Sequence, residues 1–99
     1  MKVRWTTTAR QSYFFSILDY LEQSWSKREV ISFIDEVNIL VDQICHHPKM
    51  FQESGNKRQI RKGFVTKDVS LYYRYRPHKK EIELLTFWDN RQNPEKLNF

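Results

Sequence analysis

The spacing of hydrophobic residues divides the chain into a helical first half and an extended second half. Val3 and Trp5 alternate with charged residues, which predicts a short opening strand. Three threonines at positions 6–8 can then cap a helix. The apolar face of that helix repeats at intervals of four in Ala9, Tyr13, Ile17 and Leu21, and it is widened by Phe14 and Leu18. We therefore expect a strand followed by a helix that ends near Ser24.

The next segment predicts a second and longer helix. Ser26 and Glu29 have the spacing of a capping box, in which the two side chains satisfy the free end of the helix backbone. Behind them runs an apolar stripe made of Val30, Phe33, Ile34, Val37, Leu40, Val41 and Ile44. This stripe predicts a helix that reaches His46 and ends before Pro48. Because the link at Trp25 is very short, we expect the two helices to form an antiparallel hairpin.

Beyond a loop at 49–57, the hydrophobic period changes to two, which is typical of strands. The first predicted strand extends from Arg58 to Val65, with Ile60 and Phe64 on one face. The second places Val69, Leu71, Tyr73 and Tyr75 on one side and Tyr72, Arg74 and Arg76 on the other. Turns at 66–68 and 77–80 lead to a last strand from Glu81 to Trp88. The predicted fold class is α+β in the order β-α-α-β-β-β, with the helical hairpin packed on a twisted antiparallel sheet.

Size and composition indicate one intracellular domain. A chain of 99 residues has surface for one hydrophobic core, so residues 1–99 should form a single domain. The one cysteine, Cys45, excludes an intrachain disulfide and fits a reducing compartment. The N-terminus lacks the apolar run of a signal peptide, and no stretch approaches the roughly 20 apolar residues that cross a bilayer. We expect a cytoplasmic protein.

The net charge of +5 comes entirely from the second half of the chain. Positions 1–50 hold six Lys or Arg and six Asp or Glu, whereas positions 51–99 hold eleven and six. Nine basic residues lie between Lys57 and Lys80, where Asp68 is the only acid. Such a local field favours a polyanion or an acidic protein as partner. A basic surface that serves solubility alone explains the charge equally well.

Three segments resemble the RelE/ParE toxin superfamily. Residues 3–6 with Ala9 are similar to its first strand and helix start, and Leu71-Tyr72-Tyr73-Arg74-Tyr75 is similar to its central strand. Residues 82–97, which include Arg91, are similar to its last strand and trailing arginine segment. Their order and spacing agree with the β-α-α-β-β-β layout. The resemblance implies a toxin of a bacterial type II toxin-antitoxin system, held in check by an antitoxin encoded beside it.

The resemblance implies one of two activities with different chemistry. ParE-like members bind DNA gyrase and trap it as a cleaved DNA complex, with no catalysis of their own. RelE-like members cut messenger RNA on the ribosome, and the matching catalytic positions here would be Arg61 (or its neighbour Lys62), Arg74 and Arg91. A degenerate toxin that retains only antitoxin binding is a third alternative. Either a homodimer or a hetero-oligomer with the antitoxin is compatible with the resemblance.

The candidate residues for binding a target or a phosphate are basic or aromatic: Arg58, Arg61, Lys62, Lys67, Tyr72, Arg74, Trp88 and Arg91. Metal-independent RNA cleavage also requires a base and an acid. RelE-like nucleases usually place a tyrosine, sometimes with a histidine, just after the arginine that matches Arg91, and residues 92–99 contain neither. Glu95 is a poor substitute because an exposed glutamate is mostly ionised at neutral pH. This absence favours the ParE-like activity.

Several candidates also have purely structural explanations. We expect Tyr73 and Tyr75 in the core and Tyr72 as a half-exposed strand residue, although Tyr72 can also stack on a base. Arg74 can pair with Glu81 or Glu83 across the meander rather than bind a phosphate. Phe87 and Trp88 lie on opposite faces, so one of them should serve a protein interface or be covered by residues 94–99.

The sequence predicts neither a metal nor a cofactor. His46 and His47 are adjacent, so on a helix they point about 100° apart, and no second cluster completes a site with Cys45. Histidines near a helix C-terminus instead favour the helix dipole.

Overall fold

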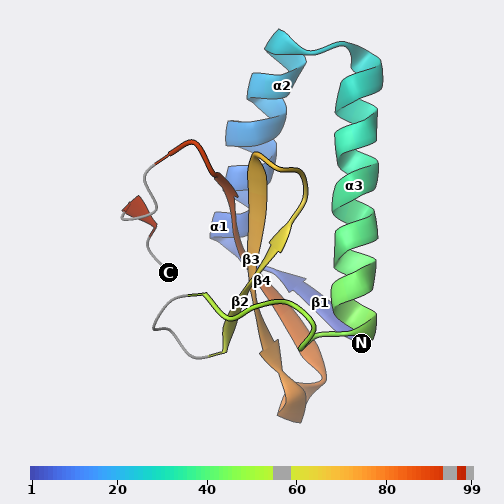
Figure 1. The fold of residues 1–99 in the computed structure, drawn as a ribbon, viewed down its shortest axis with the longest axis vertical. Coiled ribbons are helices and arrows are strands. Elements are labelled where there is room, and N and C mark those ends of the chain that lie inside the picture. Colours follow the sequence, from blue (N-terminus) through green and yellow to red (C-terminus); the bar gives the residue numbers. More distant parts are fainter. Residues whose placement is uncertain (55–58, 93–95, 98–99) are drawn as a thin grey trace.

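A computed structural model of the chain describes residues 1–54, 59–92, 96 and 97, without the side chains at positions 14–16, 20 and 22. The elements follow in the order β1 (Lys2–Trp5), α1 (Thr7–Gln11), η1 (Ser12–Leu18), α2 (Asp19–Ser24), α3 (Lys27–His46), β2 (Ile60–Phe64), β3 (Val69–Arg76), η2 (Pro77–Lys79) and β4 (Glu81–Asp89). Two antiparallel helical rods stand beside a twisted sheet (Figure 1). The predicted α+β fold class and helical hairpin are confirmed.

The first helical rod is continuous from Thr7 to Ser24, and its middle section, η1, is π-helical. Thr6 caps its start, since the hydroxyl accepts a hydrogen bond from the backbone N–H of Ala9 at 3.1 Å. The same hydroxyl donates to the carbonyl of Leu84 at 2.8 Å. Thr6 therefore ends β1, starts α1 and fastens both to β4.

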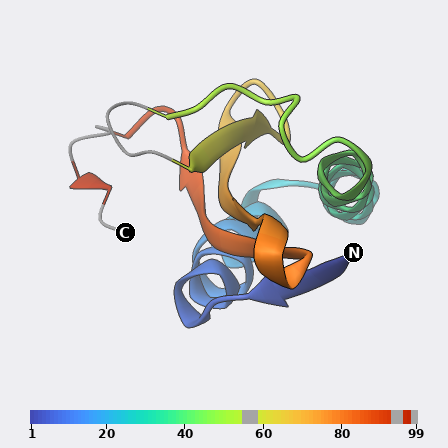
Figure 2. The same ribbon diagram turned by 90° about the horizontal axis from the view of Figure 1, so that it is seen from below.

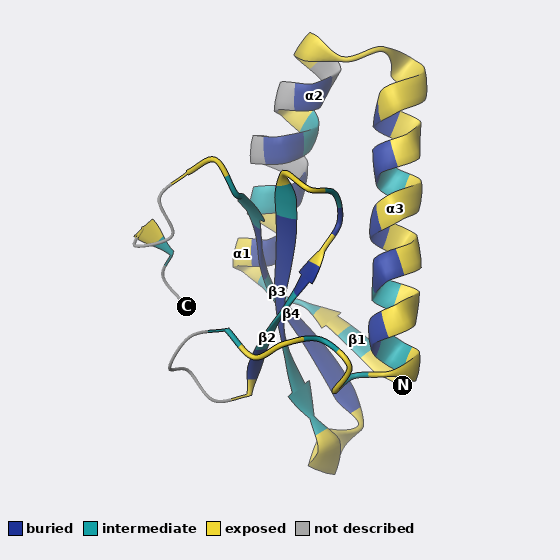
Figure 3. Ribbon diagram, in the orientation of Figure 1, coloured by how far each residue is buried: buried dark blue, intermediate teal, exposed yellow. Residues whose placement is uncertain are grey.

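The second rod, α3, begins and ends where the sequence predicts. Ser26 and Glu29 form the capping box, each side chain bonding to the other residue's backbone N–H. The buried residues of α3 are Val30, Phe33, Val37, Leu40 and Ile44. They form one stripe that faces the sheet, and the opposite side of the helix is exposed (Figure 3).

The four strands form one sheet in the order β1-β4-β3-β2. The β2–β3 and β3–β4 pairs are antiparallel, as the predicted meander requires. The opening strand β1 instead lies parallel to β4, with Val3 opposite Ile82 and Trp5 opposite Leu84. The sheet is therefore mixed rather than wholly antiparallel, because the helical hairpin carries the chain across the sheet between β1 and β2 (Figure 2).

A bulge interrupts the pairing of β3 with β4. Tyr72 pairs with Thr86 and Tyr73 pairs with Leu84, so Leu85 has no partner opposite it. The hydroxyl of Ser12 accepts a hydrogen bond from the N–H of Phe87 at 3.0 Å just beyond the bulge. The start of the helical hairpin is thus tied to β4 on both sides of the irregular residue.

One face of the sheet packs against both helical rods. The core joins helix residues such as Tyr13, Phe33 and Leu40 to the strand residues Leu71, Tyr73, Ile82, Leu84 and Phe87. Gly63 belongs to this face, because a Cβ there would lie 3.0 Å from a methyl carbon of Leu40. Val69 and Tyr75 pack at its margin, which confirms the predicted core side of β3.

The predicted strand from Arg58 to Val65 is confirmed from Ile60 to Phe64. Arg58 lies outside the described residues. Ile60 and Phe64 share a face, as expected, and it is the face turned away from the helices. Ile60 is buried there, whereas Phe64 is 58% exposed.

The capping box should contribute measurably to stability. Replacing Ser26 with alanine removes the acceptor for the N–H of Glu29, and we expect the free energy of unfolding to fall by about 1 kcal/mol. Urea denaturation followed by circular dichroism measures the change. Ser32→Ala, at an exposed position within α3, is the matched control and should change stability by less than about 0.5 kcal/mol. Equal losses in the two variants would contradict the capping role.

Candidate functional site

The sheet face turned away from the helices carries most of the candidate residues, and we call it the outer face. Side chains alternate along a strand, so the residues opposite those of the core belong to it. The strand registers place the following residues there: Lys2, Arg4, Ile60, Lys62, Phe64, Ser70, Tyr72, Arg74, Arg76, Glu81, Glu83 and Trp88. Of the predicted site residues, Lys62, Tyr72, Arg74 and Trp88 lie on this face.

One end of the outer face is an ion-pair network. The carboxylate of Glu83 contacts three guanidinium groups: Arg4, Arg74 at 3.7 Å and Arg76 at 3.5 Å. Arg4 also donates a hydrogen bond to Glu81 at 3.0 Å. Glu83 is 5% exposed, so its charge is compensated inside the fold. The predicted pairing of Arg74 across the meander is confirmed with Glu83.

The network shifts the ionisation of its second carboxylate. The hydrogen bond from Arg4 holds the pKa of Glu81 below its ordinary value, and burial acts in the opposite direction. Because the folded pKa lies below the unfolded one, this contact stabilises the fold above the ordinary carboxyl pKa. Its contribution is lost as the pH falls through the lower, folded value.

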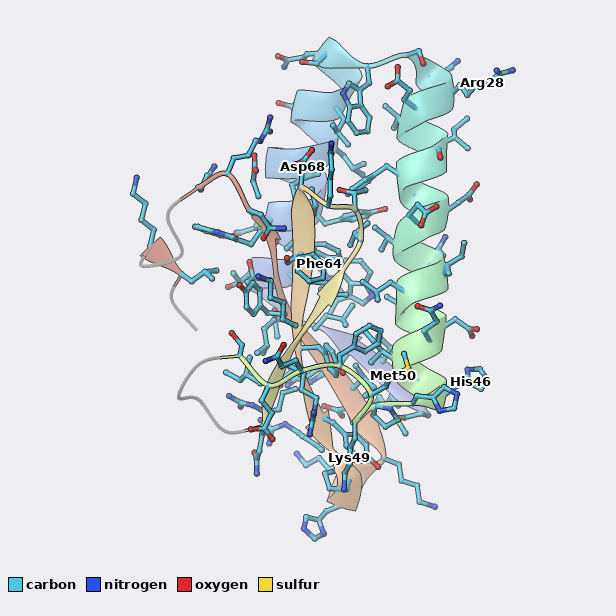
Figure 4. The ribbon with its side chains drawn as sticks, in the orientation of Figure 1. Arg28, His46, Lys49, Met50, Phe64 and Asp68 are labelled. Atoms are coloured by element: carbon cyan, nitrogen blue, oxygen red, sulfur yellow. The ribbon has the colours of Figure 1, made fainter. Side chains whose placement is uncertain are left out.

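The other end of the outer face holds a hollow of about 210 Å³. We call it the outer hollow, and its walls are Lys62, Phe64, Lys67, Tyr72, Trp88, Asn90 and Gln92. The ammonium group of Lys62 lies 5.0 Å from the ring centre of Phe64 and 5.8 Å from that of Tyr72. Phe64 is exposed on β2, and Asp68 marks the tip of the β2–β3 turn beside it (Figure 4). Four predicted residues, Lys62, Lys67, Tyr72 and Trp88, therefore meet here.

Tyr72 is buried, at 3% exposure, and the prediction of a half-exposed residue is wrong. The alternation of β3 is regular, but the neighbours on the outer face are large enough to cover the ring, among them the Lys62 side chain above it. Burial raises the pKa of Tyr72, and a hydrogen bond with Ser54 opposes the shift. A phenol in this setting stays protonated at neutral pH.

Trp88 and Phe87 lie on opposite faces of β4, as the sequence predicts. Phe87 is in the core, where it stacks near Trp5 and Tyr13. Trp88 is partly exposed at the outer hollow, and its indole nitrogen Nε1 is buried with no hydrogen-bond partner among the described residues.

Arg61 performs a structural task on the opposite side of β2. Its guanidinium group donates to the carbonyls of Phe51 at 2.6 Å and Lys49 at 3.3 Å, and it pairs with Glu53 at 3.4 Å. The loop after α3 is also held by the Tyr73 hydroxyl, which donates to the carbonyl of Pro48 at 2.8 Å. Burial raises the pKa of Tyr73 to about 12, so this donor keeps its proton.

Arg91 lies beyond the end of β4 and forms a forked contact with Asp89, at 2.8 Å and 3.0 Å. These hydrogen bonds lower the pKa of Asp89. The three arginines that match RelE-like catalytic positions thus have separate partners: Arg61 binds loop carbonyls, Arg74 pairs with Glu83, and Arg91 pairs with Asp89. Within the described part of the chain they do not converge on one empty position.

Sequence reasoning missed three members of the outer face. Arg4 and Arg76 complete the ion-pair network, and Phe64 forms a wall of the outer hollow. The alternation of β2 placed Phe64 with Ile60, but the sequence does not say which face of that strand meets the helices. Gly63 was the available signal, since a glycine between Lys62 and Phe64 marks close approach to a neighbour.

A larger hollow, of about 680 Å³, lies between the helical hairpin and the adjoining end of the sheet. We call it the hairpin groove, and its apolar walls include Leu21, Trp25, Phe33, Val69 and Trp88. Asp89 and Arg91 line the same groove. It offers an apolar surface bordered by charge, which is the character of a protein-binding cleft.

The described residues indicate neither a metal centre nor a reactive thiol. The described residues contain no group of three or more His, Cys, Asp or Glu that is able to hold a metal ion. Burial raises the pKa of the Cys45 thiol, which disfavours the reactive thiolate. Over the same residues, no helix is long and apolar enough to cross a membrane.

Removing the shared carboxylate should destabilise the fold. We expect Glu83→Gln to lower the free energy of unfolding by about 2 kcal/mol, because Arg74 and Arg76 lose their carboxylate partner and Arg4 loses one of its two. The loss stays at this level since the arginines themselves are partly exposed to water. Urea denaturation measures it, with Glu36→Gln on the exposed side of α3 as control. A loss no larger than that of the control would show that the network is not stabilising.

The fold matches solved toxin structures at low sequence identity. A YoeB/ParE toxin from Agrobacterium tumefaciens aligns with a TM-score of 0.66 and 13% identity, over 90% of this chain and 98% of that one. The chromosomal ParDE system from P. aeruginosa gives a TM-score of 0.65 and 16% identity, over 90% and 95%. A copper-bound mutant toxin from Helicobacter pylori gives 0.58 and 18%, over 92% and 96%.

No protein-family model matches the sequence, and no curated protein matches it significantly. The structural matches extend over nearly the whole chain and nearly the whole of each matched toxin. The predicted resemblance is confirmed at the level of architecture: this chain has the fold of the YoeB/ParE toxins.

Proposed function

We propose that this chain is the toxin of a type II toxin-antitoxin system and that it acts by binding a target protein, without catalysis of its own. The observation that carries the proposal is the separation of the candidate arginines. Each is engaged by a carboxylate or a carbonyl of the chain itself. A nuclease needs several cationic groups preorganised around one phosphate, and the described residues do not supply that arrangement.

Side chains able to transfer protons are also scarce in the described part of the candidate site. Residues 92–99 contain neither tyrosine nor histidine. Tyr72 lines the outer hollow with Lys62 and Lys67, but burial raises its pKa, so the phenol stays protonated at neutral pH and cannot serve as a base. The described part of the site therefore supports recognition better than acid–base chemistry.

DNA gyrase is the target that we propose. The basis is the similarity of the fold to a chromosomal ParDE system, together with the missing proton-transfer groups. Gyrase poisoning requires only that the toxin bind and hold a protein–DNA intermediate. Such an activity fits a small domain with exposed aromatic and basic residues.

An antitoxin partner is the second part of the proposal. The hairpin groove has apolar walls from both helical rods and the sheet, and it is large enough to receive side chains of a helix laid along it. The basic second half of the chain attracts an acidic antitoxin, and opposite charge speeds association.

A RelE-like nuclease acting on ribosome-bound messages is the alternative. One observation favours it: Lys62 and Lys67 gather beside aromatic residues in the outer hollow. Such a group of residues can hold single-stranded RNA. The alternative needs a proton donor and acceptor that the described residues do not place there.

Expression of the chain alone in bacteria should stop DNA synthesis before protein synthesis. Pulse labelling with thymidine and methionine in the minutes after induction measures the order. The control is Phe33→Asp, which buries a charge in the core and should abolish both effects by unfolding the domain. An earlier fall in protein synthesis, with cleaved messages, would reject gyrase as target and establish the nuclease alternative. Normal growth would indicate a degenerate toxin.

A further inference from the structure

We propose that the outer hollow binds a carboxylate group from an acidic segment of a partner protein. The inference rests on the proposed function, in which the chain acts through protein contacts, and it names the chemistry of one contact. Three observations on the outer face carry it, each made on the part of the chain that the structure describes. They are lysines without an ion-pair partner, an indole N–H without an acceptor, and the contrast with the opposite end of the same face.

Among the described residues, the positive charge in the outer hollow has no carboxylate paired with it. Lys62 and Lys67 line the hollow, and neither forms an ion pair with a carboxylate among the described residues. Lys62 is only partly exposed and lies against two aromatic rings. A carboxylate brought to this ammonium group would gain a charge-assisted hydrogen bond in a site with less water than the open surface.

The indole of Trp88 adds a donor that lacks an acceptor. Its Nε1 is buried and has no partner among the residues that the structure describes. A buried donor left unpaired costs free energy, which an incoming acceptor recovers. Asn90 is already engaged, since its side chain bonds to Ser70 and to the carbonyl of Lys67. Trp88, which lines the hollow, therefore carries an N–H that gains a partner if a ligand oxygen reaches it.

The two ends of the outer face differ in where their anions come from. At one end, Glu81 and Glu83 neutralise the guanidinium groups and are themselves buried. At the other end, the described residues place the lysines and the indole without an equivalent acid. The chain supplies its own carboxylates at the first end, whereas the described residues of the second end offer cations that suit a carboxylate from a partner.

A carboxylate fits this hollow better than a nucleic acid base does. Stacking needs an open aromatic face, but Tyr72 is buried and the Lys62 ammonium group lies over both neighbouring rings. The hollow thus presents a cation and an N–H donor ahead of a stacking surface. Exposed Phe64 at its rim provides apolar contact for the body of an acidic side chain or its neighbour.

The test is an NMR titration of the full chain that follows its tryptophan indole N–H signals. The probe is an eight-residue peptide of alternating glutamate and alanine, blocked at both ends, and its glutamine counterpart is the neutral control. Trp88→Phe assigns the Trp88 signal. We expect the glutamate peptide to move this signal downfield in a saturable way, and the glutamine peptide to bind at least tenfold more weakly.

Variants then locate the contact. Lys62→Gln should lower the affinity for the glutamate peptide about tenfold, because one charge-assisted hydrogen bond is lost. Lys79→Gln, which removes the same charge from the exposed turn η2 at the other end of the sheet, should change affinity less than twofold. Equal weakening by both variants would reduce the effect to general charge and overturn the proposal.

Other occupants give different results. Single-stranded RNA that binds more tightly than the peptide, and loses that affinity in Lys62→Gln, would assign the hollow to nucleic acid instead. Self-association in sedimentation that Lys62→Gln abolishes would assign it to a second copy of the chain. If the peptide binds but expression of the chain leaves DNA synthesis in cells unchanged, this inference stands and gyrase is rejected as the target. Failure of this inference and failure of the proposed function therefore give different results.

Discussion

The packing of both helical rods on one face of the sheet is the constraint on which the rest of the structure depends. Because side chains alternate along a strand, burying one face sends every second strand residue to the other. Leu71 and Tyr73 enter the core, so Tyr72 and Arg74 must lie on the outer face. The bulge at Leu85 preserves this division, since Leu84 and Phe87 both remain on the core side despite the extra residue.

Because of that constraint, the charged residues that the core cannot accept lie on the outer face. The two ends of this face differ in how those charges are paired. At one end the arginines are neutralised by buried glutamates, which makes them structural. At the other, lysines and aromatic residues form a hollow, and neither lysine forms an ion pair with a described carboxylate. A surface of this kind suits recognition of a partner, whereas RNA cleavage needs several free cations aimed at one phosphate. This difference supports our proposal that the chain acts by binding a target protein.

The sequence predicts the elements well and the side-chain partnerships less well. The capping box at Ser26 and the stripe of α3 depend on local spacing, so their bounds follow from the chain itself. The parallel pairing of β1 with β4 and the burial of Tyr72 depend on contacts between distant segments, which local periodicity does not contain. Arg61 illustrates the same limit: a basic residue on a strand suggested phosphate binding, yet its guanidinium group holds the loop after α3.

The most direct test of the central claim is a DNA cleavage assay with the purified chain, gyrase and supercoiled plasmid. After denaturation and proteolysis, we expect linear plasmid that depends on both proteins, because in our proposal the chain traps gyrase on cleaved DNA and cuts nothing itself. The contradictory result is plasmid left intact at saturating amounts of folded chain, while the same preparation cleaves messages in a translating extract.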